Sequence, residues 1–383
     1  MIDEQHRVGI DTVNIDDVYS PDYTAHIDRL RHEAALVLAR IAMRHIFGTG
    51  ETTHDPNAIP PREAPQRQPF FFRKRLIEYL HDRGDLFRRG TNYWPTAGLM
   101  ERAGMSEADY FGAEVDSPTL RAMKDVESIA GGVLQGVDGL ALLKEEIGAE
   151  ETWRTWQYVM VDAVPKQACN SLVARALDRR LRAGTPTVVF EGGAGLGATL
   201  REALRIEGFS RRAKNIELYG FTDINRPLMR RAKEMLERES PGLLSVTRFD
   251  RVDLDELAGY DDLPYLRDGS VDIIIFENVL HDVERLHKVL SSSRRILKKG
   301  GWLVFTSGIR VRPGLFFPCE LLQSTLHSYY RAELDPPRRV NVGYPSIEEW
   351  TASLIGAGFP VFRIYPNPEQ REKWPFGGII AQR

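Results

Sequence analysis

The sequence has little cysteine and no long apolar run. Its two cysteines, Cys169 and Cys319, lie far apart and form no C-x-x-C pair. This usage does not support a disulfide framework and fits a reducing compartment, so we expect a cytoplasmic protein. No apolar run reaches the roughly 18 residues that span a bilayer, and the first residues, MIDEQHRVGIDTVNIDD, lack the apolar segment of a signal peptide. We therefore expect no association with a membrane.

An excess of charge of one sign is also absent. The chain has 51 Lys and Arg against 54 Asp and Glu, which gives a formal net charge of −3 at pH 7. This balance offers no general electrostatic attraction to nucleic acid, and we expect no nucleic-acid partner. The histidines and acidic residues show no metal-ligand spacing, so we predict no metal site.

The chain divides into two parts near residue 184. Residues 1–184 are expected to form a mainly helical domain, because apolar residues recur at helical spacing in several segments: 28–47, 70–84, 118–147 and 151–183. Residues 88–112 alternate polar turns with Tyr, Trp and Leu, which suits the small hairpin of a winged-helix module. A clear basic recognition helix is missing there.

Residues 185–383 form the second domain and alternate strand-like with helix-like segments. TVVFE, IELYGFTD, LSVTRFDRVD, VDIIIFENVL and WLVFTSG read as strands, and helical patterns of 10–15 residues separate most of them. This alternation predicts an α/β fold with a doubly wound parallel sheet, in which ligands bind at the carboxyl ends of the strands.

A glycine-rich loop follows the first of these strands. VVFEGGAGLGATL carries Gly193, Gly195 and Gly197, which allow tight turns and a close approach of a ligand to the backbone. A P-loop is excluded because no Lys follows the glycines, and the dinucleotide pattern G-x-G-x-x-G is only met with Ala198 at its last position. A nicotinamide oxidoreductase is thereby disfavoured but stays an alternative.

Acidic residues at successive strand ends indicate a cationic ligand. Glu191 stands directly before the glycines, where its charge would oppose a pyrophosphate and favour the sulfonium and ammonium groups of S-adenosylmethionine. Asp223 ends the second strand, where it can accept hydrogen bonds from ribose hydroxyls. Asp253 ends the third and can receive an adenine amino group or cap a helix.

These segments resemble class I S-adenosylmethionine-dependent methyltransferases. FEGGAGLG, GFTDIN, VDIIIFENVLHDV and RRILKKGGWLVF are similar to that family's successive motifs, and the tail is similar to its last helix and antiparallel hairpin. The resemblance covers about residues 185–383 and implies a Rossmann-like seven-stranded sheet. It also implies that Ile224, Leu254, Glu277 and Asn278 join the three glycines and the acids in the cofactor site.

Two subfamilies come nearer: polyketide-type C-methyltransferases and small-molecule O-methyltransferases. They imply His281 as a catalytic base, a small-molecule or carrier-bound acyl acceptor in specialised metabolism, and an N-terminal domain that covers substrate or forms a homodimer. The polyketide-type enzymes place a Glu that orients the His at the end of the fifth strand, where this sequence reads FTSG with Thr306 and Ser307. Asp282 is expected to cap the next helix.

The segment 309–345 supplies the expected substrate contacts. His327, Tyr330 and Arg331 form an aromatic and basic group there that suits an aromatic or acidic substrate. Several arginines read either as solvated surface or as contacts to a phosphopantetheine arm: Arg310, Arg312, Arg338 and Arg339.

Two further functions remain open at this point. One is an enzyme of the same fold that consumes S-adenosylmethionine without methyl transfer, by cyclisation or aminobutyryl transfer. The other, weaker one is a non-catalytic regulator that binds DNA through the N-terminal domain.

Overall fold

The chain forms two compact units in a computed structural model. The structure describes residues 13, 18, 21–48, 52–53, 58, 60–61, 63–311, 318–371, 373 and 375–383. We call Asp22–Val164 with Arg310–Arg331 the helical unit. The sheet unit comprises Pro165–Ile309 and Ala332–Arg383, together with the residues before Asp22. Each is described here by itself.

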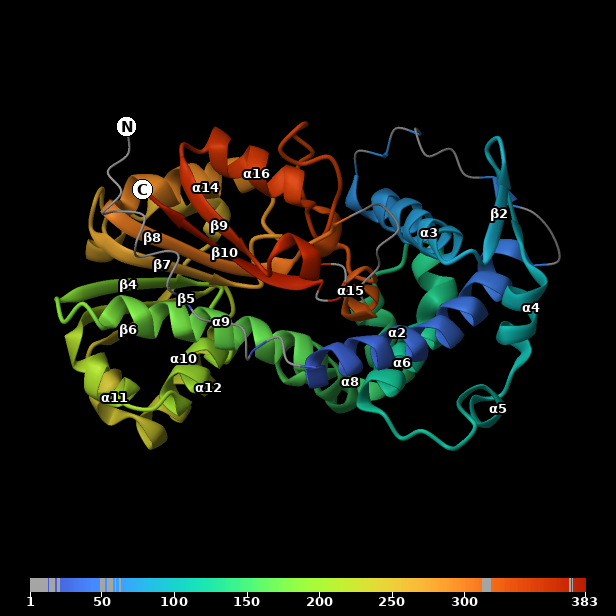
Figure 1. The fold of residues 1–383 in the computed structure, drawn as a ribbon, viewed down its shortest axis with the longest axis horizontal. Helices are drawn as coiled ribbons and strands as arrows, with labels where there is room; N and C mark the ends of the chain where they lie inside the picture. The colour runs from blue at the N-terminus through green and yellow to red at the C-terminus, as the bar shows by residue number, and fades with distance from the viewer. Residues whose placement is uncertain are drawn as a thin grey trace. The chain divides into compact units, whose positions relative to one another are not determined.

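The helical unit is built from amphipathic helices around one apolar core. The helices are α2 (Pro21–Ala42), α3 (Ala64–Asp82), α4 (Ala97–Gly104), α5 (Glu107–Phe111), α6 (Pro118–Leu134), α7 (Gly139–Glu146), α8 (Gly148–Gln157) and α15 (Pro318–Gln323) (Figure 1). Its core includes Leu76 and Leu80 of α3, Val126 of α6, and Leu321 and Leu322 of α15. The mainly helical character expected of the N-terminal region is confirmed.

Two helices expected to be continuous are each divided. The predicted helix 118–147 breaks between α6 and α7, where Gly136 adopts φ 87° and Asp138 caps α7 by accepting a hydrogen bond from the Leu140 amide. The predicted helix 151–183 breaks at Ala163, where the backbone is extended just before Val164 and Pro165. Since Pro165 has no amide hydrogen, it suits the first turn of a new helix.

The expected hairpin is present within the helical unit. Strands β2 (Leu86–Arg89) and β3 (Asn92–Pro95) pair antiparallel, and β1 (Thr52–Thr53) adds to the other side of β3. The short helices α4 and α5 follow it, and a winged-helix module remains a prediction.

The sheet unit contains a seven-stranded sheet in the order β6-β5-β4-β7-β8-β10-β9. The strands are β4 (Thr187–Gly192), β5 (Ile216–Asp223), β6 (Thr247–Arg251), β7 (Val271–Glu277), β8 (Leu297–Gly308), β9 (Val361–Tyr365) and β10 (Phe376–Gln382). The first five run parallel, whereas β10 runs antiparallel to both of its neighbours. The predicted fold class, including the final antiparallel hairpin, is confirmed.

Helices cover both faces of this sheet, as its nearly continuous apolar strands require. The helices α9 (Val164–Leu181), α10 (Ala198–Arg205) and α12 (Arg226–Glu239) lie on one face, and α14 (Leu286–Ile296) and α16 (Ile347–Gly356) lie on the other (Figure 1). Short helices α11 (Phe209–Arg212) and α13 (Pro241–Leu244) complete the connections. The carboxyl ends of β4, β5 and β7 therefore share one edge.

The boundaries of the two units differ from those expected. Helix α9 belongs to the sheet unit because Leu172 packs against Gly378 of β10, where an added Cβ would lie 2.6 Å from Leu172 Cδ2. The boundary thus lies at Val164/Pro165 instead of 184/185. Segment 310–331, expected in the C-terminal domain, belongs to the helical unit because Leu321 and Leu322 enter its core.

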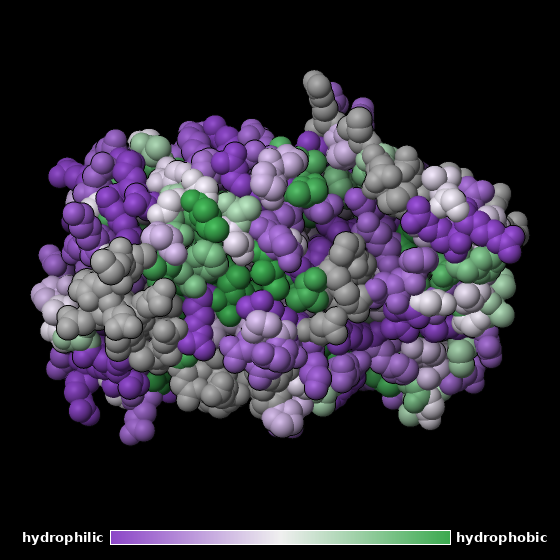
Figure 2. All heavy atoms as spheres, turned by 45° about the horizontal axis from the view of Figure 1, so that its top comes forward, coloured by the Kyte–Doolittle hydropathy of each residue, from purple (hydrophilic) through white to green (hydrophobic). Residues whose placement is uncertain are grey.

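The surface in view is mainly polar (Figure 2). Large exposed apolar side chains, such as Phe87, Met100 and Ile355, come from separate elements and are scattered. Among the described residues, none of the helices is both long and apolar enough to cross a bilayer.

Candidate active site

The glycine loop between β4 and α10 has the backbone geometry that the sequence predicted. Gly193, Gly195 and Gly197 have φ of 66°, 54° and 75°, values that favour glycine. A Cβ on Gly193 would lie 2.6 Å from Cγ2 of Val279, whereas a Cβ on Gly195 would meet no atom nearer than 4.0 Å. The loop is therefore packed against protein at Gly193 and is open over Gly195.

Glu191 is buried at the end of β4, directly before this loop. It is 1% exposed, and its Oε2 accepts a hydrogen bond of 2.5 Å from the Tyr219 hydroxyl. Its Oε1 is buried without a hydrogen-bond partner among the described residues. Burial raises the pKa of Glu191 to about 7, the hydroxyls of Tyr219 and Thr199 oppose the shift, and the nearby acids Glu277 and Asp223 add to it. Among the described residues, no positively charged side chain therefore balances the ionised form of Glu191.

Asp223 joins the glycine loop to the end of β5. Its Oδ2 accepts from the Gly195 amide at 2.9 Å, and its Oδ1 accepts from the Asn225 amide at 2.7 Å. A carboxylate has about four acceptor positions, so these bonds leave room for further donors. Ile224 follows it and is 54% exposed, which places an apolar side chain beside the carboxylate at this edge.

Asp253 lies beyond β6 and caps a short 3₁₀ helix, Leu254–Gly259. Its Oδ1 accepts from the Asp255 amide at 3.0 Å, which is the helix-capping role weighed from the sequence. Leu254 is buried beneath the loop, since a Cβ on Gly192 would lie 2.7 Å from Leu254 Cδ2. Cofactor contacts by both residues remain predictions.

Glu277 and Asn278 stand at the end of β7. The Asn278 amide donates to the backbone oxygen and to Oγ1 of Thr306 on β8, and Asn278 has a positive φ of 50°. Glu277 Oε1 and Asn278 Oδ1 are buried and lack hydrogen-bond partners within the described part of the chain. Burial raises the pKa of Glu277 to about 7, and Lys166 opposes the shift.

His281 is fully buried in the loop after β7. Its ring centroid lies 4.4 Å from that of Tyr344, and its Nε2 lies 3.4 Å from Oδ2 of Asp282. Burial lowers the pKa of His281 well below its usual value, and the positive charges of Lys166 and Arg339 lower it further. The imidazole is therefore neutral at pH 7 and holds a basic nitrogen.

Two expectations about the surroundings of His281 were wrong. Asp282 does not cap α14, which has no side-chain cap and whose N-cap is Arg285. Arg339 is 1% exposed and is no surface residue, because its guanidinium donates to the backbone oxygens of His281 and Val283. It therefore holds the loop that carries His281.

Sequence reasoning missed Lys166 and Tyr344. Lys166 lies in the first turns of α9, is fully buried, and its Nζ is 3.5 Å from the Tyr344 hydroxyl. Tyr344 is also fully buried and lies flat against β8, where a Cβ on Gly308 would come 2.6 Å from its ring. A lysine within a helical pattern gives no signal of burial, and Gly308 is the single local hint of a close approach.

The predicted substrate residues have packing roles within the helical unit. His327 Nε2 lies 2.9 Å from the oxygen of Gly136, and Tyr330 is buried and donates to the oxygen of Ser324. Arg331 is exposed. Their contacts with a substrate remain predictions.

The other arginines singled out from the sequence have different surroundings. Arg310 is buried and pairs with Glu320 at 2.5 Å, so it is not a solvated residue. Arg338 is partly exposed and pairs with Asp335 at 2.7 Å. Arg312 lies outside the described residues.

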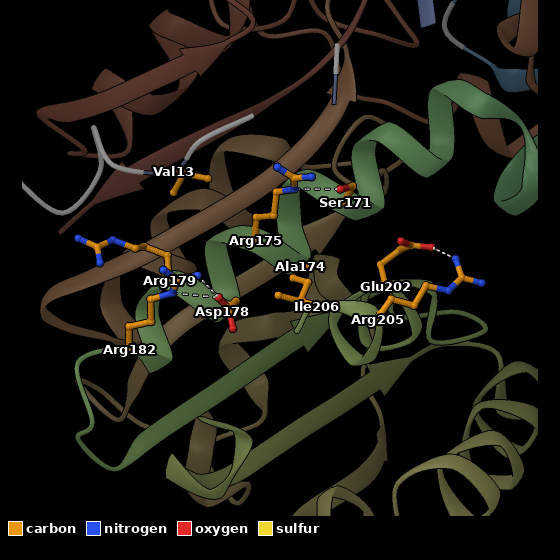
Figure 3. Close-up of a pocket in the computed structure, with 10 residues that line it drawn as sticks. All are labelled: Val13, Ser171, Ala174, Arg175, Asp178, Arg179, Arg182, Glu202, Arg205 and Ile206. Atoms are coloured by element: carbon orange, nitrogen blue, oxygen red, sulfur yellow. Dashed lines mark hydrogen bonds and ion pairs between the residues drawn. The ribbon is translucent and has the colours of Figure 1, made fainter. Parts of the chain in front are cut away.

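A separate cavity lies beside α9 and α10 and contains none of the predicted residues. It has a volume of about 440 Å³ and is rich in arginine, with Arg175, Arg179 and Arg182 along α9 and Arg205 from α10 (Figure 3). Asp178 points among these residues and pairs with Arg182. Arg205 pairs with Glu202 (Figure 3). Acidic neighbours thus offset part of the positive charge.

Residues 190–303, which hold the glycine loop, the acids and His281, match the profile of a methyltransferase domain family. Over these residues the chain is similar to that methyltransferase family. The match spans β4 to the middle of β8, the strands whose carboxyl ends form the candidate site.

Curated relatives match this chain over short parts of far longer proteins. A polyketide synthase-like protein of Preussia isomera, Preu9, is 29% identical over 187 residues, which cover 47% of this chain and 8% of that protein. A highly reducing polyketide synthase of Purpureocillium lilacinum, lcsB, is 30% identical over 171 residues, which cover 45% of this chain and 6% of that protein. The chain thus spans less than a tenth of the length of either relative.

Solved structures share the fold across nearly the whole chain. The DszA carbon methyltransferase has a TM-score of 0.69 and 18% identity, and 96% of this chain and 95% of that chain are covered. The CurJ carbon methyltransferase has a TM-score of 0.65 and 18% identity, with coverage of 99% and 96%. The helical unit is therefore part of the shared fold.

Proposed function

We propose that this chain uses S-adenosylmethionine to methylate an acidic carbon of an acyl chain in specialised metabolism. Glu191 is the observation that carries the proposal: a buried acid with an unbonded Oε1 lies under an open glycine loop. A ligand with positive charge and no phosphate satisfies that acid, and a pyrophosphate would oppose it. Polyketide synthase relatives and carbon methyltransferase neighbours support an acyl acceptor and C-methylation.

The residues present fit this cofactor. Glu191 and the loop around Gly195 would hold its charged amino acid part, and Asp223 has acceptor capacity for the ribose. The exposed side chain of Ile224 and the end of Asp253 would border the adenine. When bound, S-adenosylmethionine supplies a methyl group on a sulfonium, which is already activated toward attack by a nucleophile.

His281 is the group that would remove the proton of the acceptor. Its low pKa keeps the imidazole neutral, which is the form that a general base needs. Asp282 at 3.4 Å favours a proton on Nε2, which leaves Nδ1 as the basic nitrogen. Arg339 fixes the backbone of the same loop, so the ring is held in place without the Glu that the polyketide-type pattern places near Thr306.

The other parts of the proposal concern partners. We propose a free or carrier-bound acyl acceptor, with His327, Tyr330 and Arg331 near it, and no nucleic-acid or membrane partner. We propose that the helical unit covers the substrate or forms a homodimer. The location expected from the two cysteines is the cytoplasm.

By-product analysis tests the reaction class. The protein is incubated with S-adenosylmethionine, with and without an acetoacetyl thioester, and the adenosyl products are separated by mass spectrometry. Methyl transfer yields S-adenosylhomocysteine only when the acceptor is present. Methylthioadenosine formed without an acceptor would overturn the proposal in favour of a reaction on the cofactor's own side chain.

A further inference from the structure

Lys166 is a buried cation in the sheet unit, and its charge lowers the pKa of His281. The methyl-transfer scheme above gives Lys166 no role. Its side chain rises from the first turns of α9 and is 0% exposed. Burial of an ammonium group is costly unless strong partners compensate it. A lysine at such a position therefore needs an explanation in packing or in function.

Lys166 contacts aromatic side chains, and the carboxyl groups of Glu277 and Asp282 interact with its charge at longer range. Its Nζ lies 3.5 Å from the Tyr344 hydroxyl, a long hydrogen bond, and 5.3 Å from the ring centroid of Phe376. In the part of the chain that the structure describes, Lys166 forms no ion pair. An ammonium has three donors, so it retains capacity for an acceptor that a ligand brings.

The charge of Lys166 acts on the groups of the candidate site. It lowers the pKa of Glu277 against the effect of burial, and it contributes to the low pKa of His281. Tyr344 contacts both partners, since its ring lies 4.4 Å from that of His281 and its hydroxyl lies beside Lys166. A cation and a neutral base thus border the same aromatic ring.

A second buried polar group lies one helical turn further along α9. Asn170 follows Lys166 by four residues, so both side chains lie on one face of the helix. Asn170 is 3% exposed, and its Oδ1 is buried without a hydrogen-bond partner among the described residues. This face of α9 therefore carries polar groups whose hydrogen bonds the protein does not complete.

We propose that the Lys166 ammonium binds the acceptor oxygen that becomes negative when His281 removes the neighbouring carbon-bound proton. The inference rests on the proposed function, in which loss of the α-proton from an acyl thioester places negative charge on an oxygen of the acceptor. A preorganised cation in a dry site stabilises such a charge far more than water does. This role accounts for a fully buried lysine that forms no close ion pair among the described residues.

In this step the basic nitrogen of His281 takes the α-proton, and the electron pair of the C–H bond becomes an enolate whose oxygen lies against Lys166. The enolate carbon then forms a bond to the methyl carbon as the bond from methyl to sulfur breaks. The products are the α-methylated thioester, neutral S-adenosylhomocysteine and one proton, which His281 releases to solvent.

Exchange of the α-protons tests this role without the cofactor. The full chain is mixed with acetoacetyl-N-acetylcysteamine in D₂O, and the loss of the α-proton signal above the buffer rate is followed by NMR. Lys166→Met is expected to slow saturated exchange by about 10²-fold or more, the usual cost of removing one oxyanion donor. Lys214→Met, at an exposed lysine of the same unit, serves as the matched control and retains the wild-type rate.

Two measurements separate a chemical role from a structural one. Because methionine fills a similar volume without a buried charge, Lys166→Met should melt at or above the wild-type temperature and bind S-adenosylmethionine normally in calorimetry. An exchange rate in this variant equal to the wild-type rate would overturn the proposal. So would a slower rate that returns to the wild-type value at a saturating concentration of thioester. Wild-type protein that binds the cofactor but catalyses no exchange would instead overturn the proposed acceptor class.

Discussion

At the scale of single residues, the buried carboxyl group of Glu191 links cofactor affinity to pH. Its pKa of about 7 means that the carboxyl is largely protonated below that pH when no cation is present. A cationic cofactor binds the ionised form, so binding below about pH 7 must release a proton. Each pH unit below the pKa then costs up to about 1.4 kcal/mol of binding free energy.

We therefore predict that affinity for S-adenosylmethionine rises as the pH increases through about 7 and levels off above it. Calorimetry in buffers of different ionisation enthalpy should detect the released proton. Glu191→Gln removes the titrating group and should flatten the dependence of affinity on pH. Glu277→Gln serves as the matched variant, because Glu277 is the other acid of the site with a pKa near 7. An affinity that is constant between about pH 6 and 8 would contradict this account.

His281 provides the second prediction at this scale. His281→Ala should reduce methyl transfer by about 10²–10⁴-fold, the range for a lost general base. Its affinity for S-adenosylmethionine should change little, since Glu191 and Asp223 are the groups proposed to hold the cofactor. Turnover by the variant at the wild-type rate would remove His281 from the mechanism.

At the scale of elements, two glycines of the loop between β4 and α10 have different surroundings, so one can report on packing and the other on access of a ligand. Both Gly193 and Gly195 have positive φ, so Ala at either position costs about 1–2 kcal/mol of backbone strain. Gly193→Ala also drives a Cβ into Val279, a stiff side chain, whereas the space over Gly195 is open. The two variants are therefore a matched pair.

We predict that Gly193→Ala lowers the melting temperature more than Gly195→Ala does. Gly195→Ala should keep most of the stability and still lose cofactor affinity, because its methyl group occupies the space reserved for the ligand. Thermal melts and calorimetry of the two purified variants measure both effects. Normal affinity in Gly195→Ala would show that the cofactor does not approach the loop there.

The position of each residue along the elements decides whether the sequence could predict its place in the candidate site. The sequence could predict that the glycine loop, Glu191 and Asp223 lie together, because they stand at the ends of consecutive strands, and their contacts with a cofactor remain predictions. Lys166, Tyr344 and Arg339 reach the site from α9 and from the segment after Ala332, and no local pattern links them to β7. Asp253 caps a short helix, since its Oδ1 accepts a hydrogen bond from the Asp255 amide.

At the scale of the whole molecule, the two units divide the chain differently from its linear order. Helix α9 belongs to the sheet unit, and segment 310–331 returns to the helical unit. Linear reading placed the boundary at residue 184 because the helices α8 and α9 follow each other without a polar linker. Contacts such as Leu172 with Gly378, which join residues distant in sequence, decide the assignment.

Hydrogen exchange on the full chain tests this division. In mild denaturant we expect the amides of α9 to exchange together with those of β4 and β7, as one cooperative unit. Amides of residues 320–331 should exchange together with those of α3 and α6. The assignment would be contradicted if the amides of α9 lost their protection together with those of the helical unit.

At this scale too we propose that the chain transfers the methyl group of S-adenosylmethionine to the α-carbon of an acyl thioester. This transfer is tested most directly by incubating the protein with acetoacetyl-N-acetylcysteamine and S-adenosylmethionine that carries a deuterated methyl group, followed by NMR and mass spectrometry of the thioester. We predict that the labelled methyl group appears on the α-carbon, together with an equal amount of S-adenosylhomocysteine. A label on oxygen, or cofactor consumed while the thioester stays unlabelled, would contradict the account.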